Sequence, residues 1–167
     1  TTQTLNFSVQ DCAGNVLSSS VNFELGALPG INELLITEIM ATPTPSQGLP
    51  THEYIEIYNN SSEIIALNEV YLTDNLGRVV IGDYNLNPSE YLILCKNSAV
   101  ADLSAFGNTL GINSFPTFTI QDKARLENAD SSLVFEIAYD KSLFKDDTKD
   151  DGGFSLEMIR LNPSCQS

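Results

Sequence analysis

The chain has 167 residues, which is enough for one substantial domain with a core. Its 22 acidic and 8 basic residues give a formal net charge of -14. A surface this acidic repels phosphates, so we expect neither direct nucleic-acid contact nor binding to an anionic membrane. The apolar run YLILC is too short to cross a bilayer, so we also expect no membrane insertion.

Two segments with alternating apolar residues open the chain and predict a β-hairpin. TLNFSVQ and SVNFEL both have a period of two, and DCAGN between them offers Gly14 and Asn15 for positive φ. We predict that residues 1–26 belong to a preceding module or form an extra hairpin, that residues 27–33 are a linker, and that residues 34–167 form the main domain. The abrupt start at TTQTLNFSVQDC leads us to expect a piece of a longer protein.

The stretch HEYIEIYN resembles a zinc-peptidase motif but predicts a strand. His52, Glu53 and Glu56 have the order H-E-x-x-E, whereas zinc peptidases need two histidines on one helix face, and His52 is the only histidine. Ile55 and Ile57 alternate with polar or aromatic residues, so we predict that they face the core. We expect His52 to be a loop residue with few obligatory partners.

Strand signals recur along the rest of the chain, and no helix signal accompanies them. The predicted strands are LLITEIM, EYIEIYN, IIALNEVYLTD, GRVVIG, EYLILC, FTIQD, KARLEN, LVFEIAYD and FSLEMIRL, separated by loops such as ATPTPSQGLPT. Many short strands at this spacing predict an all-β antiparallel sandwich or barrel.

Three cysteines at wide spacing indicate neither a zinc knuckle nor a dithiol redox site. We interpret Cys95, in the apolar run YLILCKN, as a small buried hydrophobic residue. Cys12 and Cys165 lie near the two ends, and we hypothesise that they pair with residues outside this sequence.

Two enzyme hypotheses fit the sequence poorly. Glu38, Glu53 and Glu56 offer carboxylates for glycoside hydrolysis, but acidic residues on exposed strand positions are far commoner, and the chain has no Trp for sugar stacking. A Ser-His-Asp triad would have to use His52, and no G-x-S-x-G motif is present. We therefore predict no enzyme activity and assign no catalytic or cofactor-binding residue.

The strongest candidate for a metal site is the loop DKSLFKDDTKDDGG. Its carboxylates at Asp146, Asp147, Asp150 and Asp151 could serve calcium, which takes six to eight oxygen ligands. The spacing is not that of an EF-hand, and the interleaved lysines oppose cation binding. We expect a solvated loop, with calcium as the alternative.

Several of these motifs together resemble the lamin-tail domain, especially its versions in large secreted bacterial proteins. They are ITEIM, HEYIEIYNNSSEIIAL, VYLTDN, LNPSEYLILCKN and GGFSLEMIR with NPSC, in the order typical of the family. The resemblance runs from about Leu34 to Cys165 and implies an immunoglobulin-like β-sandwich. In addition, VQDCAGN resembles the last hairpin of an immunoglobulin-like module that often stands before such a domain.

The resemblance implies a non-catalytic module of a secreted or cell-surface bacterial multidomain protein. We expect it to bind a protein or a cell-surface polymer, or to act as a spacer, and to be a monomer, since the charge opposes self-association. The alternatives are an accessory domain that presents carbohydrate to a linked hydrolase and a calcium-dependent adhesion module. The family motif Gly152 and Gly153 would allow a sharp turn into the last strand.

Overall fold

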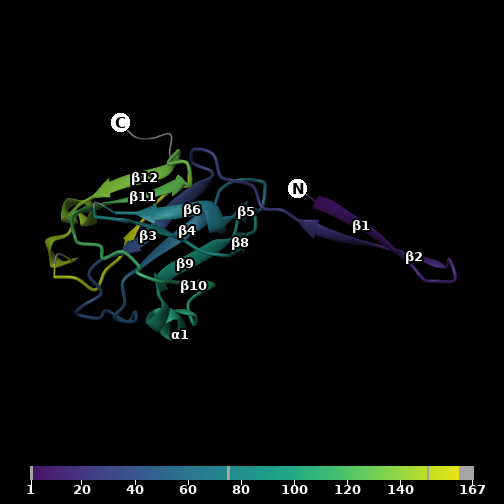
Figure 1. Ribbon diagram of the computed structural model, residues 1–167. Helices are drawn as coiled ribbons and strands as arrows, with labels where there is room; N and C mark the ends of the chain where they lie inside the picture. The colour runs from purple at the N-terminus through teal and green to yellow at the C-terminus, as the bar shows by residue number, and fades with distance from the viewer. Residues whose placement is uncertain (1, 75, 150, 162–167) are drawn as a thin grey trace.

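Two β-sheets pack face to face around the main core (Figure 1). The computed structural model describes residues 2–74, 76–149 and 151–161. The five-stranded sheet has the order β10-β9-β4-β3-β13, with β3 at Leu34–Met40, β4 at Tyr54–Asn59, β9 at Tyr91–Lys96, β10 at Thr109–Ile112 and β13 at Leu156–Glu157. The four-stranded sheet has the order β12-β11-β6-β7, with β6 at Val70–Thr73, β7 at Arg78–Val80, β11 at Asp122–Asn128 and β12 at Leu133–Tyr139. Neighbouring strands are antiparallel except β9 and β10, so the predicted all-β antiparallel sandwich is confirmed with one parallel pair added.

Alternating side-chain directions place the isoleucines of β4 on the core side of the sheet. Ile55 and Ile57 of β4 are both 0% exposed and contact the core between the sheets, as predicted. Burying one such side chain contributes roughly 1.5–3 kcal/mol, and β4 lies between β3 and β9 at the centre of its sheet. A second apolar cluster on the opposite face of this sheet contains Met40, Tyr54 and Cys95. Cys95 is therefore a buried hydrophobic residue, as interpreted from the sequence.

The predicted N-terminal hairpin is confirmed, with β1 at Thr2–Gln10 and β2 at Val16–Glu24. Gly14 takes a φ of +88° in the turn, and the Asp11 carboxylate accepts hydrogen bonds from the backbone N–H groups of Ala13 and Asn15. In Figure 1 the hairpin projects from the sandwich. One of its faces carries Leu5, Phe7, Val9, Leu17, Val21 and Phe23, all between 43% and 70% exposed. The predicted domain boundaries stay a prediction.

Short elements connect the strands. They are β5 at Ile65–Ala66, β8 at Asn85–Leu86, η1 at Leu67–Glu69, η2 at Asn97–Ala99, α1 at Val100–Leu103, η3 at Lys141–Phe144 and η4 at Asp147–Lys149. The segment IIALNEVYLTD is thus not one strand, because η1 separates β5 from β6. None of the helices within the described ranges is long and apolar enough to cross a membrane.

Two of the predicted strands are largely wrong. Within FTIQD only Asp122 belongs to a strand, because Phe118 is buried edge-on against Phe115, with ring centroids 5.9 Å apart, without needing a β partner. Within FSLEMIRL only Leu156–Glu157 is a strand. Beyond Glu157 the Met158 N–H still donates to the Thr37 carbonyl at 2.7 Å, and Thr37 is where a β-bulge interrupts the register between β3 and β4.

The expectation that His52 is a loop residue with few obligatory partners needs correction. Its Nε2 lies 2.8 Å from Oδ2 of Asp102 in α1, so it has a specific partner fifty residues away. The contact joins the loop before β4 to the helix that follows β9. The helix itself was not predicted, although Ala99 and Leu103 are buried at helical spacing.

Mutating the centre of β4 should test the strand assignment. Ile57→Ala should lower the free energy of unfolding by about 2–5 kcal/mol, because it removes buried methyl groups and leaves a cavity. His52→Ala should cost about 1 kcal/mol or less, since the Asp102 side chain is 63% exposed and water screens the pair. Urea denaturation measures both values, and a larger loss for His52→Ala would contradict this order.

Candidate functional site

A groove runs along one open side of the sandwich, between the last strands of the two sheets. β12 ends the four-stranded sheet and β13 ends the five-stranded sheet. The space between them has a volume of about 590 Å³. Its apolar lining consists of Ile36 and Ile39 from β3, Ile137 and Tyr139 from β12, Leu143 from η3, Leu156 from β13, and Met158 and Ile159, which follow β13. Charged side chains of both signs also line it, namely Glu38, Lys145, Glu157 and Arg160.

Two glycines place β13 beside this groove. Gly152 and Gly153 have φ of +96° and +83°, which confirms the predicted sharp turn before the last strand. The Gly153 N–H donates to the Thr42 carbonyl at 2.7 Å, and an added Cβ at Gly153 would collide with the Pro45 carbonyl. The wall formed by β13 therefore depends on close backbone contact with the loop after β3.

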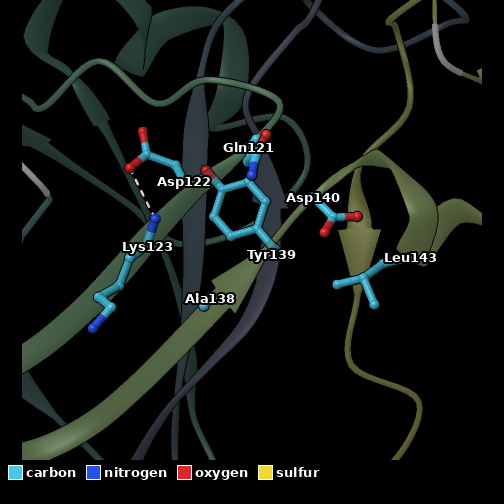
Figure 2. Close-up of a pocket in the computed structure, with 7 residues that line it drawn as sticks. All are labelled: Gln121, Asp122, Lys123, Ala138, Tyr139, Asp140 and Leu143. Carbon is cyan, nitrogen blue, oxygen red and sulfur yellow. Dashed lines mark hydrogen bonds between the residues drawn. The ribbon is translucent and has the colours of Figure 1, made fainter.

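Tyr139 separates the groove from a second hollow of about 470 Å³. Figure 2 shows its ring between Gln121 and Asp122 on one side and Asp140 and Leu143 on the other. The side chain is 4% exposed, and its hydroxyl has no hydrogen-bond partner among the described residues. Burial raises the pKa of the Tyr139 hydroxyl, so this buried group stays neutral.

The carboxylates beside Tyr139 have structural roles. Asp140 accepts a hydrogen bond from the Ser142 backbone N–H at 2.7 Å and caps η3. Asp122 accepts from the backbone N–H groups of Lys123 and Thr119 at 2.8 and 3.2 Å. Both acids are therefore already used to hold turns, and the second hollow offers no free chelating pair.

A row of three carboxylates crosses the outer face of the five-stranded sheet beside the groove. Glu38 lies opposite Glu56 on one side and opposite Glu157 on the other. Tyr54 donates from its hydroxyl to Glu38 at 2.5 Å, and Thr37 donates to Glu56 at 2.7 Å. Among the described residues, no ion pair joins any of the three to a cation, although Arg160 lines the same hollow as they do, so the neighbouring carboxylates repel one another.

The repulsion affects the protonation of Glu56. Burial raises the pKa of its carboxyl group above 4.5, the Thr37 hydrogen bond opposes the shift, and the charges of Glu38 and Glu157 add to it. Glu53 does not join the row, since its neighbours are Lys96 and the Phe118 backbone. Burial raises the pKa of its carboxyl group, against the opposing effects of the Lys96 charge and a hydrogen bond from the Phe118 backbone. The structure thus brings together two of the three carboxylates considered for glycoside hydrolysis and separates the third.

The calcium hypothesis stays a prediction. Asp146 accepts hydrogen bonds from the Thr148 backbone N–H and hydroxyl at 3.0 and 2.7 Å, and these bonds lower its pKa. Asp151 is exposed, whereas Asp150 and the side chain of Asp147 lie outside the described residues. Cys165 also lies outside them, and Cys12 is exposed and free. Within the part that the structure describes, no three acidic, His or Cys side chains form a metal-binding cluster.

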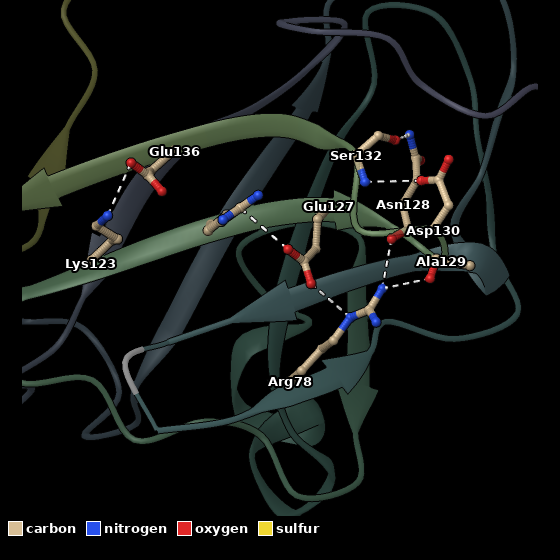
Figure 3. Close-up of polar contacts among 9 residues, drawn as sticks. Arg78, Lys123, Glu127, Asn128, Ala129, Asp130, Ser132 and Glu136 are labelled. Atoms are coloured by element: carbon tan, nitrogen blue, oxygen red, sulfur yellow. Dashed lines mark hydrogen bonds and ion pairs between the residues drawn. The ribbon is translucent and has the colours of Figure 1, made fainter.

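A polar network on the four-stranded sheet engages three of the eight basic residues (Figure 3). Arg78 lies 2.8 Å from Glu127, donates to the Asn128 carbonyl and stacks 3.8 Å from the Tyr71 ring centroid. Arg125 approaches the same Glu127 at 3.3 Å, close enough for an ion pair but without hydrogen-bond geometry. No pattern in the sequence indicated this network, which holds the sheet rather than presenting cations to a ligand.

A sequence profile of the Lamin Tail Domain family matches residues 29–141, about two-thirds of the chain. The chain belongs to the lamin tail domain family. No curated protein and no solved structure matches it. This lamin tail domain is an immunoglobulin-like all-β domain, as the resemblance implied, and the family is a non-catalytic type of interaction module. The match includes β12 and ends before β13, so one wall of the groove lies beyond the matched residues.

Removing the charge of Glu56 should stabilise the domain at neutral pH. Because its pKa is raised in the folded state, the unfolded chain loses the proton first, and stability falls as the pH rises from about 4.5 through the folded pKa. Glu56→Gln should therefore raise the free energy of unfolding at about pH 7 and change it little at about pH 4. Urea titrations at both pH values measure this, with exposed Glu63→Gln as control; an equal effect at both values would contradict the assignment.

Calcium and EDTA should each leave the melting temperature unchanged. Asp146 is already bound to Thr148, and Lys145 and Lys149 repel cations from the same loop. Differential scanning calorimetry with added calcium and with the chelator measures this. A rise in melting temperature with calcium that Asp146→Asn abolishes would establish the alternative.

Proposed function

We propose that this lamin tail domain is a non-catalytic binding module of a secreted or cell-surface bacterial multidomain protein, and that it binds a polypeptide partner in the groove between β12 and β13. The observation that supports this most is the groove itself, which combines an apolar floor from both sheets with charged residues. Binding sites commonly have this composition, because apolar contacts supply affinity and polar groups fix orientation.

The lining favours a polypeptide over carbohydrate. Its floor is mainly aliphatic, with Ile36, Ile39 and Ile137, and the one aromatic side chain that lines it, Tyr139, is buried. Sugar rings are usually held by exposed aromatic faces, whereas branched aliphatic side chains fit the apolar side chains of a peptide. Presentation of carbohydrate to a linked hydrolase is therefore the second candidate.

The N-terminal hairpin supports a place within a longer protein. In the part of the chain that the structure describes, β1 and β2 pair only with each other, and their apolar face is exposed. An exposed apolar face of this kind is expected where another module packs. We propose that residues 1–26 complete a preceding immunoglobulin-like module, that residues 27–33 link it to the sandwich, and that the protein is a monomer.

A groove mutation should separate binding from folding. Peptides selected from a random phage-displayed library on the wild-type domain should bind Ile137→Arg at least about tenfold more weakly, because a charge replaces an apolar contact. Leu76→Arg is the matched control, since Leu76 is 92% exposed on the β6–β7 turn. Fluorescence polarisation measures affinity and thermal melts check folding. Equal affinity for both variants, or binding on a glycan array in place of peptides, would overturn the proposal.

A further inference from the structure

The edge of β12 that faces away from β11 has unused backbone hydrogen-bonding groups. Val134 directs its carbonyl away from β11 and accepts from the Asn32 N–H at 2.8 Å. Alternate residues of a strand point their backbone groups to the same side, so Glu136 and Ala138 also point outward. Among the described residues, no hydrogen bond reaches the backbone of either one.

The opposite wall cannot satisfy these groups. β13 pairs with β3 over two residues, and the Met158 N–H continues that pairing by donating to Thr37. The groove of about 590 Å³ separates this wall from β12. The β12 edge therefore borders an apolar space and has two N–H donors and two carbonyl acceptors directed along the sheet.

We propose that an extended segment of a partner polypeptide adds to the edge of β12 as a further strand and lies in this groove. This inference rests on the proposed function and names the class of its partner. Strand addition uses main-chain hydrogen bonds for affinity and alternate side chains for specificity. At the usual spacing of about 4.8 Å between strands, every second side chain of the added strand points toward Ile39 and Leu156.

Charge complementarity defines the partner further. Glu38 and Glu157 line the groove together with Lys145 and Arg160, and the two carboxylates lie opposite each other on neighbouring strands, where they repel each other. A lysine or arginine of the partner relieves that repulsion, and the net charge of -14 attracts a basic segment from a distance. The partner is thus an extended segment with apolar residues at every second position and at least one basic residue.

The same charge disfavours a second copy of this chain. Two copies would bring together two molecules that each carry a net charge of -14, and this repulsion opposes their association. The strand β1 has the required alternation, with Leu5, Phe7 and Val9, but no basic residue. Self-association is therefore an outcome that the test must detect.

Removing one outward N–H tests the strand addition. Proline is tolerated on a strand edge when its missing N–H faces outward, so Ala138→Pro should fold and lose one hydrogen bond to the added strand. The matched control, Ala138→Ser, keeps the N–H. Peptides from the phage library should show apolar residues at every second position with Lys or Arg, and should bind Ala138→Pro at least about tenfold more weakly than Ala138→Ser.

A second measurement does not depend on how the variant folds. Methylating the backbone nitrogens of one selected peptide, one at a time, should weaken binding to the wild-type domain at alternate positions only, because only alternate N–H groups face β12. Glu38→Gln combined with Glu157→Gln should weaken binding of the same peptide and reduce its dependence on salt.

The outcomes separate the two proposals. A methylation scan with no alternation, or equal binding to Ala138→Pro and Ala138→Ser, overturns strand addition. If Ile137→Arg still weakens binding in that case, the groove remains the binding site and only the strand inference fails. A library that yields no groove-dependent peptide overturns both. If light scattering shows that the wild type self-associates and that Ala138→Pro does not, the added strand comes from a second copy of this chain, and the proposed partner is wrong.

Discussion

Burial of alternate aliphatic side chains between two sheets is the constraint on which the rest of this structure depends. Because side chains alternate along a strand, one face of β3, β4 and β9 must be apolar, and a shift of one residue would expose all of it. That requirement fixes the register of Ile55 opposite Leu94 and of Ile57 opposite Leu92. The fixed register in turn places Glu38 and Glu56 directly opposite each other on the outer face, although they repel. The free energy gained by burying the aliphatic side chains thus keeps Glu38 and Glu56 opposite each other despite their repulsion.

A sandwich of two open sheets also has edges, and the two sides of this one differ. At one side the two sheets end at β10 and β7, and α1 lies against β9 and β10, where Leu103 belongs to the same apolar cluster as Cys95. At the other, β12 ends its sheet without a neighbour and β13 covers β3 over only two residues. Native proteins usually protect a free strand edge, because it pairs readily with other chains. The surrounding acidic charge is one such protection against self-pairing, and it leaves the edge available to a basic partner.

The sequence predicted most of the fold because local alternation determines which residues are buried. It predicted β4 with Ile55 and Ile57 inward, the hairpin, and the glycines before β13. It failed where burial does not require a strand, as at Phe118, and where a helix has only four residues, as at α1. The groove could not be predicted in the same way, since its lining comes from β3, β12 and β13, which meet only in the folded sheet order. The contact between His52 and Asp102 likewise joins residues whose proximity no local pattern encodes.

The short strand β13 forms one wall of the groove. It is held by its pairing with β3 and by the glycine turn before it, and it lies after the last residue of the family match. The central strands fold around a core to which Leu156 and Met158 contribute only from its periphery. Sequence changes in β13 can therefore reshape one wall of the groove without disturbing the central strands of the sandwich. Substitutions at a handful of positions after Gly153 would in this way alter the shape of the groove while the central strands keep their register.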